Sequence, residues 1–177
     1  MRTTRRALLA APAVAATPVL GAASSTVPAV MVSTWDFGTL ANQAGWEQRL
    51  AGGSALDMVE AGGRLAEDDP TNTSVGLGGR PDRDGRVTLD ACVMTWAGDI
   101  GAVCALEDIN HAVSVARAVM ERTPHTMLVG EGARSFALAE GFETVRMPTP
   151  ESEAAWREWL LTADYAPLAN RENLEWR

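Results

Sequence analysis

The glycine-rich stretch from residue 71 to residue 84 is the densest group of residues in the sequence that could bind a ligand. Gly76, Gly78 and Gly79 suggest a phosphate-binding loop of the dinucleotide type. However, Pro81 occupies the third glycine position of that pattern, and no helix is expected to open there. We interpret the stretch as a long surface loop, the kind of segment in which binding residues are concentrated.

Aspartates at the end of this loop suggest a calcium site. Asp82 and Asp84 precede Gly85, and Asp90 follows it. A calcium loop of the EF-hand type has a third carboxylate before its glycine and a bidentate glutamate after it, and this sequence has neither. The spacing favours a solvated turn that leads into a strand near Val87, and no metal site is predicted.

The histidines and cysteines form no catalytic or metal-binding pattern. His111 and His125 have no neighbouring group of carboxylates and cysteines, so a zinc site is not expected. No GxSxG nucleophile elbow is present. Cys92 and Cys104 each lie in an apolar run, where a cysteine usually packs as a small core residue. Whether these two cysteines pair stays open.

Composition limits the class of protein. The 177 residues are 46% hydrophobic and 21% charged, which fits one domain with a core of ordinary size. The formal net charge is -8, and every basic side chain other than histidine is an arginine. An acidic chain repels phosphate backbones and anionic lipid, so we expect neither a nucleic-acid nor a membrane partner.

Residues 1–23 have the pattern of a signal peptide that is not part of the fold. Three arginines within the first six residues precede an apolar run from 7 to 20, and small residues follow at 21–23. Arg5-Arg6 before the apolar run resembles a twin-arginine signal, although a chance pair in an ordinary secretory signal stays open. We predict a bacterial protein that is exported to the periplasm or secreted.

The remaining elements must position the candidate loop. A β-branched run predicts a strand at 29–34, and helical spacing predicts helices at 40–50 and from Ser54 to about 66, the second with a capping box between Ser54 and Asp57. A hairpin is predicted from strands at 87–95 and 100–106. A helix at 111–122, a strand at 126–129 and helices at 132–139 and 151–161 follow. This order favours an α/β or layered α+β fold.

Several blocks of the sequence, all in one order, resemble the glycosylasparaginases. The first is Ser33-Thr34-Trp35-Asp36-Phe37-Gly38, and the second opens with Gly52-Gly53-Ser54. The other blocks lie at residues 67–70, 74–82, 87–91, 115–120 and 123–130. The similarity covers roughly residues 29–173, so residues 24–173 are assigned as one portion that is similar to the α chain of this family.

The resemblance implies a fold and a reaction. Members fold as an αββα sandwich and belong to the N-terminal-nucleophile hydrolases, which cut their own precursor before a threonine to give α and β chains. The freed threonine carries a hydroxyl nucleophile and an α-amine that serves as base. It attacks the side-chain amide of asparagine joined to N-acetylglucosamine. The family uses no metal or cofactor, and its αβ units often pair as (αβ)₂.

The resemblance also assigns site residues. Trp35 matches a tryptophan at the substrate pocket, Ser74 matches a serine that positions the threonine, and Phe37 is expected to form a wall of the pocket. Packing of Trp35 in the core and capping of the loop by Ser74 stay open as alternatives. The residues that hold the α-amino and α-carboxylate groups of the substrate belong to the β chain.

The sequence departs from the family after residue 173. Members continue with His-Asp-Thr-Ile-Gly, whose threonine is the nucleophile, whereas this sequence reads Leu174-Glu175-Trp176-Arg177. We therefore expect a chain truncated before the catalytic threonine, with residues 174–177 as a divergent tail. It would carry no catalytic residue, would be inactive alone, and would expose strands that normally meet the β portion. A natural truncation, a frameshift and deliberate shortening all stay open.

Two other functions stay open. An L-asparaginase or isoaspartyl peptidase shares the fold but usually opens with His-Gly-Gly-Ala-Gly, whereas residues 34–38 read Thr-Trp-Asp-Phe-Gly. This difference favours the glycosylated substrate over free asparagine. The hypothesis without enzymatic activity is that the chain is a nonfunctional remnant or a secreted binding module.

Overall fold

The computed structural model describes residues 29–164. The chain divides into residues 1–30 and a second unit, Met31–Arg177. Only Ala29 and Val30 of the first unit are described, and all helices and strands below belong to the second. The predicted signal peptide at 1–23 and the tail at 174–177 lie outside the described residues.

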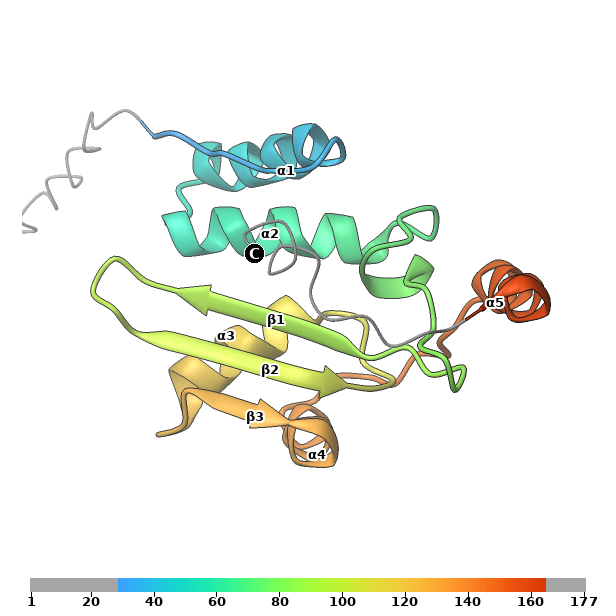
Figure 1. The fold of residues 1–177 in the computed structure, drawn as a ribbon. Coiled ribbons are helices and arrows are strands. Elements are labelled where there is room, and N and C mark those ends of the chain that lie inside the picture. The colour runs from blue at the N-terminus through green and yellow to red at the C-terminus, as the bar shows by residue number, and fades with distance from the viewer. Residues whose placement is uncertain (1–28, 165–177) are drawn as a thin grey trace, which may run out of the picture. The chain divides into compact units, whose positions relative to one another are not determined.

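Two antiparallel helices form the first part of the second unit (Figure 1). Helix α1 spans Gly38–Leu50 and α2 spans Ala55–Asp68. The predicted capping box is confirmed, because the Ser54 hydroxyl accepts from the Asp57 backbone N–H and the Asp57 carboxylate accepts from the Ser54 N–H. Two glycines let the helices approach closely: a Cβ on Gly45 would lie 2.7 Å from the Met58 carbonyl oxygen, and one on Gly62 would lie 2.8 Å from that of Ala41.

A three-stranded sheet forms the second part, in the order β1-β2-β3 (Figure 1). Strands β1 (Leu89–Met94) and β2 (Ile100–Leu106) pair antiparallel, which confirms the predicted hairpin. Helix α3 (Ala112–Arg122) then crosses over, and β3 (Met127–Val129) pairs parallel to β2. A short 3₁₀ helix, η1 (Gly76–Gly78), interrupts the loop between α2 and the sheet.

The core lies on one face of this sheet. Helices α3 and α4 (Gly130–Ala139) pack against β1, β2 and β3. The largest fully buried side chains come from β2, from the loop after it and from α3: Val103, Leu106, Ile109, Val115 and Val119. Helix α5 (Pro150–Thr162) follows α4 and begins with the Thr149 side chain accepting from the Ser152 N–H. The predicted mixed, layered fold class is confirmed.

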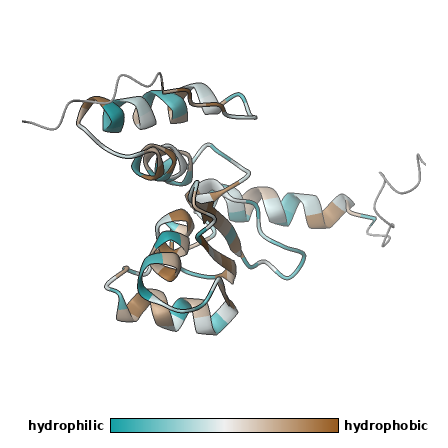
Figure 2. Cartoon of the chain, turned by 90° about the vertical axis from the view of Figure 1, so that its left-hand side faces the viewer, coloured by the Kyte–Doolittle hydropathy of each residue, from teal (hydrophilic) through white to brown (hydrophobic). Residues whose placement is uncertain are grey.

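The opposite face of the sheet is uncovered within residues 29–164. Its apolar side chains are exposed: Met94 by 63%, Ile100 by 39%, Met127 by 54% and Val129 by 55%. In Figure 2 the strands carry brown, hydrophobic colour. Cys92 is also exposed, so the prediction that it packs in the core is wrong; Cys92 and Cys104 are both free thiols. We call these five exposed residues the open face.

One predicted element is missing. Residues 29–34 form no strand. An extended segment becomes a strand only when a neighbour pairs with its backbone, and the described sheet contains only β1, β2 and β3. Val30 and Val32 are accordingly 81% and 85% exposed. Among the described helices, none is long and apolar enough to cross a bilayer.

The open face predicts self-association. Replacing Met94 and Met127 by threonine removes apolar surface from it without touching the α3 side, so we expect less oligomer in light scattering and an unchanged urea midpoint. Leu161→Thr, which removes a side chain 86% exposed on α5, is the matched control and should leave association unchanged. Equal association of the double variant and the unaltered chain would contradict this prediction.

Candidate functional site

The predicted site residues before α1 lie over the C-terminal end of α2. The glycine contacts pair Ala41 with Gly62 and Gly45 with Met58. Because the two helices are antiparallel, this register places Phe37, the N-cap of α1, at the level of the last turn of α2. The carbonyl of Trp35 accepts from the Gly38 N–H at 2.8 Å, which bends the chain into the helix.

The Ser74 loop is attached to the same turn of α2. Asn72, which is 8% exposed, donates its amide to the Ala66 carbonyl at 3.2 Å and accepts from the Ser74 N–H at 3.0 Å. Gly76 has a φ of +62° and lies so close to the Glu67 backbone that a Cβ would overlap it. A buried asparagine and a glycine therefore determine where Ser74 lies.

The structure places Trp35, Phe37 and Ser74 at one end of the helix pair. Trp35 is 71% exposed, Ser74 is exposed and Phe37 is half-buried, so Trp35 does not pack in the core. Within the described residues no hydrogen bond joins the Ser74 hydroxyl to a base. This arrangement can form an aromatic and hydroxyl-bearing wall for a ligand, but it contains no activated nucleophile. Direct contact of the three residues with a substrate stays a prediction.

Glu67 is a buried acid that the sequence interpretation missed. It is 6% exposed; its Oε1 accepts from the Val113 N–H at 3.0 Å, and its Oε2 has no hydrogen-bond partner among the described residues. Burial raises the pKa of this carboxyl to about 8. Its position four residues after Gly63, on the side of α2 that meets α3, was the available signal. In the sequence, Glu67 stood only in the block at residues 67–70, just beyond the predicted end of the second helix.

Two polar residues that follow β2 contact Asp68, the residue of α2 that comes directly after Glu67. Asn110 donates its side-chain amide to Asp68 Oδ1 at 2.7 Å, and His111 Nε2 lies 2.7 Å from the same oxygen. Asn110 is 6% exposed, and its side-chain oxygen, like Glu67 Oε2, is buried without a partner in the described part of the chain. These contacts hold the start of α3 against the end of α2.

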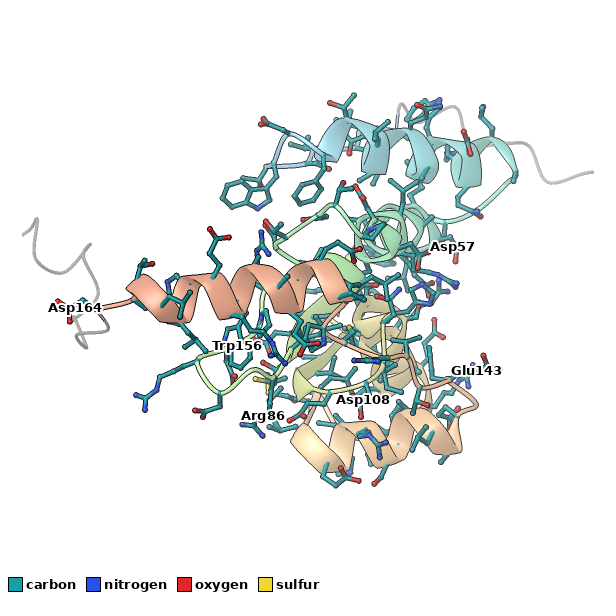
Figure 3. The ribbon with its side chains drawn as sticks, turned by 90° about the vertical axis from the view of Figure 1, so that its right-hand side faces the viewer. Asp57, Arg86, Asp108, Glu143, Trp156 and Asp164 are labelled. Atoms are coloured by element: carbon teal, nitrogen blue, oxygen red, sulfur yellow. The ribbon has the colours of Figure 1, made fainter. Side chains whose placement is uncertain are left out.

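An ion-pair network holds the other end of the interface between α2 and α3. Arg117 binds Asp57 at 2.6 Å, Glu60 at 2.7 Å and Glu121 at 2.8 Å. Asp57 is labelled in Figure 3. Hydrogen bonds from Ser54, and then the Arg117 guanidinium, lower the pKa of Asp57 to about 2. With three carboxylates already on Arg117, we interpret this cluster as structural.

Asn72→Ala tests the attachment of Ser74. The change removes two hydrogen bonds and leaves the Ala66 carbonyl and the Ser74 N–H to find other partners, so we expect a loss of about 1–3 kcal/mol in the free energy of unfolding. Urea denaturation in the Met94→Thr, Met127→Thr background measures it. Thr73→Ala, at an exposed neighbour, should change stability by less than about 0.5 kcal/mol. Equal effects of the two variants would contradict the attachment.

Glu67→Gln tests whether the buried Glu67 carboxyl makes the free energy of unfolding depend on pH. The folded-state pKa of about 8 exceeds the reference value of 4.5, so the folded chain keeps a proton that the unfolded chain loses between these values. The stability that comes from this proton is complete below pH 4.5 and falls by about 1.4 kcal/mol per pH unit until pH 8. Glu67→Gln should flatten the decline between pH 5 and 8. Glu131→Gln, at a side chain 77% exposed, should leave the decline unchanged. An unaltered slope in Glu67→Gln would show that Glu67 is ionised when folded.

Known proteins resemble this chain over most of its length. A family model described as asparaginase matches residues 21–173. A protein of Elizabethkingia miricola named N(4)-(Beta-N-acetylglucosaminyl)-L-asparaginase is 58% identical over 144 residues, which are 81% of this chain and 42% of that protein. Rat and mouse proteins of the same name are 44% and 45% identical over 138 residues, which are 77% of this chain and 39% of each.

The match covers most of this chain but less than half of each of these relatives. The chain spans about two fifths of the length of these relatives. The matched residues include α1, α2, the Ser74 loop and the whole sheet. The chain therefore belongs to the asparaginase family of N-terminal-nucleophile hydrolases, in its glycosylasparaginase branch.

Proposed function

We propose that this chain is the α portion of an exported amidohydrolase that cleaves the amide bond between asparagine and N-acetylglucosamine. The observation that carries the proposal is the 58% identity, over 81% of the chain, to a protein named for that bond. The arrangement of Trp35, Phe37 and Ser74 at one end of the helix pair is compatible with a wall of the substrate site.

The proposed reaction needs a nucleophile from the β portion. Its N-terminal threonine hydroxyl adds to the side-chain amide carbon while the threonine amine takes the hydroxyl proton. That proton passes to the leaving amino sugar as the C–N bond breaks, and water then hydrolyses the ester to release aspartate. Each donor at the oxyanion contributes about 3 kcal/mol to stabilising the transition state.

The residues of this chain have two roles in the proposal. The exposed indole of Trp35 packs against the substrate, since an aromatic ring left 71% exposed gains by covering an apolar ligand surface. Ser74 is a positioning residue that hydrogen-bonds the threonine. The short link from Ser74 through Asn72 to α2 holds it in place.

The β portion is the proposed partner. The open face has the alternation of a sheet that packs on a second sheet, with Met94 and Ile100 in register on neighbouring strands. A β portion on this face would bury apolar side chains that are otherwise in water. Pairing of αβ units into (αβ)₂ belongs to the same proposal.

Export is proposed from residues 1–23, which lie outside the described residues. The arginine pair before a short apolar run supports a twin-arginine signal. Fractionation of a bacterial host would locate the chain, and replacement of Arg5 and Arg6 by lysine should keep it in the cytoplasm.

Reconstitution tests the proposed function. The chain should be produced together with the remaining portion of the Elizabethkingia miricola relative and assayed on N-acetylglucosaminyl-asparagine. We expect turnover by the pair and none by the 177-residue chain alone. L-Asparagine and an isoaspartyl dipeptide, assayed in parallel, should be hydrolysed more slowly.

Variants of this chain, assayed in the reconstituted pair with the β portion, separate the proposed roles of Trp35 and Ser74. Trp35→Ala should mainly raise KM, whereas Ser74→Ala should lower kcat by about 100-fold at unchanged KM, because the threonine is misplaced. Trp96→Ala, at a tryptophan 99% exposed in the hairpin turn, is the control and should leave both constants unchanged. Turnover by the purified chain alone would overturn the proposal.

A further inference from the structure

A pocket of about 430 Å³ lies between α5 and the loop before β1. This volume is within the range of pockets that bind small molecules. The lining residues are Arg80, Pro81, Arg83, Ala155, Trp156 and Trp159. In Figure 3, Trp156 projects from α5 toward the loop that precedes β1. None of the roles assigned above uses this pocket.

The two walls of the pocket are joined by buried contacts. Ser152, 3% exposed, donates its hydroxyl to the Gly79 carbonyl at 2.7 Å. The Trp156 ring lies against the backbone of Gly85, where an added Cβ would be 2.9 Å from the ring. The pocket is therefore present before any ligand arrives, which lowers the ordering cost of binding.

The lining residues favour a ligand that is both cyclic and anionic. Trp156 and Trp159 are three residues apart, on one side of α5, and Trp159 is left 45% exposed. The negative face of an indole attracts the weakly positive C–H edge of a sugar ring. Both charged lining residues are arginines, in a chain with 23 acidic and 15 basic residues. Guanidinium groups bind carboxylates through paired hydrogen bonds.

One wall of the pocket is formed by the same loop that carries Ser74. The Arg80 N–H donates to the Thr73 carbonyl at 3.2 Å, so Arg80 is held beside the residue that precedes Ser74. We infer that this pocket, with Arg80 as the guanidinium that binds the carboxylate and with Trp156 and Trp159 as its aromatic wall, is a subsite for a carboxylate-bearing sugar of the glycan attached to the substrate asparagine. The link to the asparagine rests on the proposed function, whereas binding of the sugar itself does not.

The test follows the indole N–H resonances of the ¹⁵N-labelled chain, in the Met94→Thr, Met127→Thr background, during titration with 3′-sialyllactose. Trp159→Leu and Arg80→Gln remove one stacking ring and one guanidinium. Trp96→Leu and Arg157→Gln are matched controls, at a tryptophan in the hairpin turn and at an arginine of α5 that pairs with Glu153. Lactose, which has no carboxylate, is the ligand control.

We expect saturable shifts of the Trp156 and Trp159 resonances, with binding weakened about fivefold or more in each site variant and unchanged in both controls. Lactose should bind at least about fivefold more weakly than sialyllactose. No shift at about 20 mM sialyllactose, equal binding of lactose, or full binding by Trp159→Leu would overturn the inference.

The proposed subsite and the proposed function can fail independently of each other. If the reconstituted pair hydrolyses N-acetylglucosaminyl-asparagine but sialyllactose moves no indole resonance, only the subsite is wrong. If sialyllactose binds but the pair hydrolyses nothing, the pocket stands as a saccharide site and the proposed function fails.

Discussion

The last turn of α2 is the constraint on which the candidate site depends. Its residues hold two neighbouring segments, the loop after α2 and the start of α3. Ala66 accepts the Asn72 amide and Glu67 lies against Gly76, while Glu67 also accepts from the Val113 N–H and Asp68 accepts from Asn110. Most of these bonds are at least partly buried, so each broken one leaves a polar group poorly solvated. The loop that carries Ser74 and the start of α3 are thus oriented by one turn of helix.

Burial of Glu67 is part of this constraint. A carboxyl at this position satisfies a free N–H at the start of α3, which any helix leaves unpaired. Its second oxygen has no partner in the described residues, and the low polarity around it favours the protonated form. Burial of the carboxyl, and not its hydrogen bond from the Val113 N–H, raises this pKa and so links the stability of this turn to pH.

Within the described residues the sheet is covered on one face only. Helices α3 and α4 cover one face, while the open face keeps Met94, Ile100, Met127 and Val129 in water. A sheet that is apolar on both faces is typical of an inner layer, since exposing one face loses the stabilisation from its burial. The open face is thus a surface distinct from the wall that carries Ser74 and from the α5 pocket, which share one loop.

The sequence alone predicted most of the local secondary structure. The Ser54 and Asp57 capping box, the helices and the turn between the two hairpin strands were predicted because each depends on neighbours a few residues away. The family resemblance added Trp35 and Ser74 as candidates. Only the tertiary structure placed these two residues at one end of the helix pair, left residues 29–34 unpaired, exposed Cys92 and buried Glu67. Those outcomes depend on which segments distant in sequence come together. Residue spacing indicates which face of an element is apolar, but it does not say which distant segment covers that face.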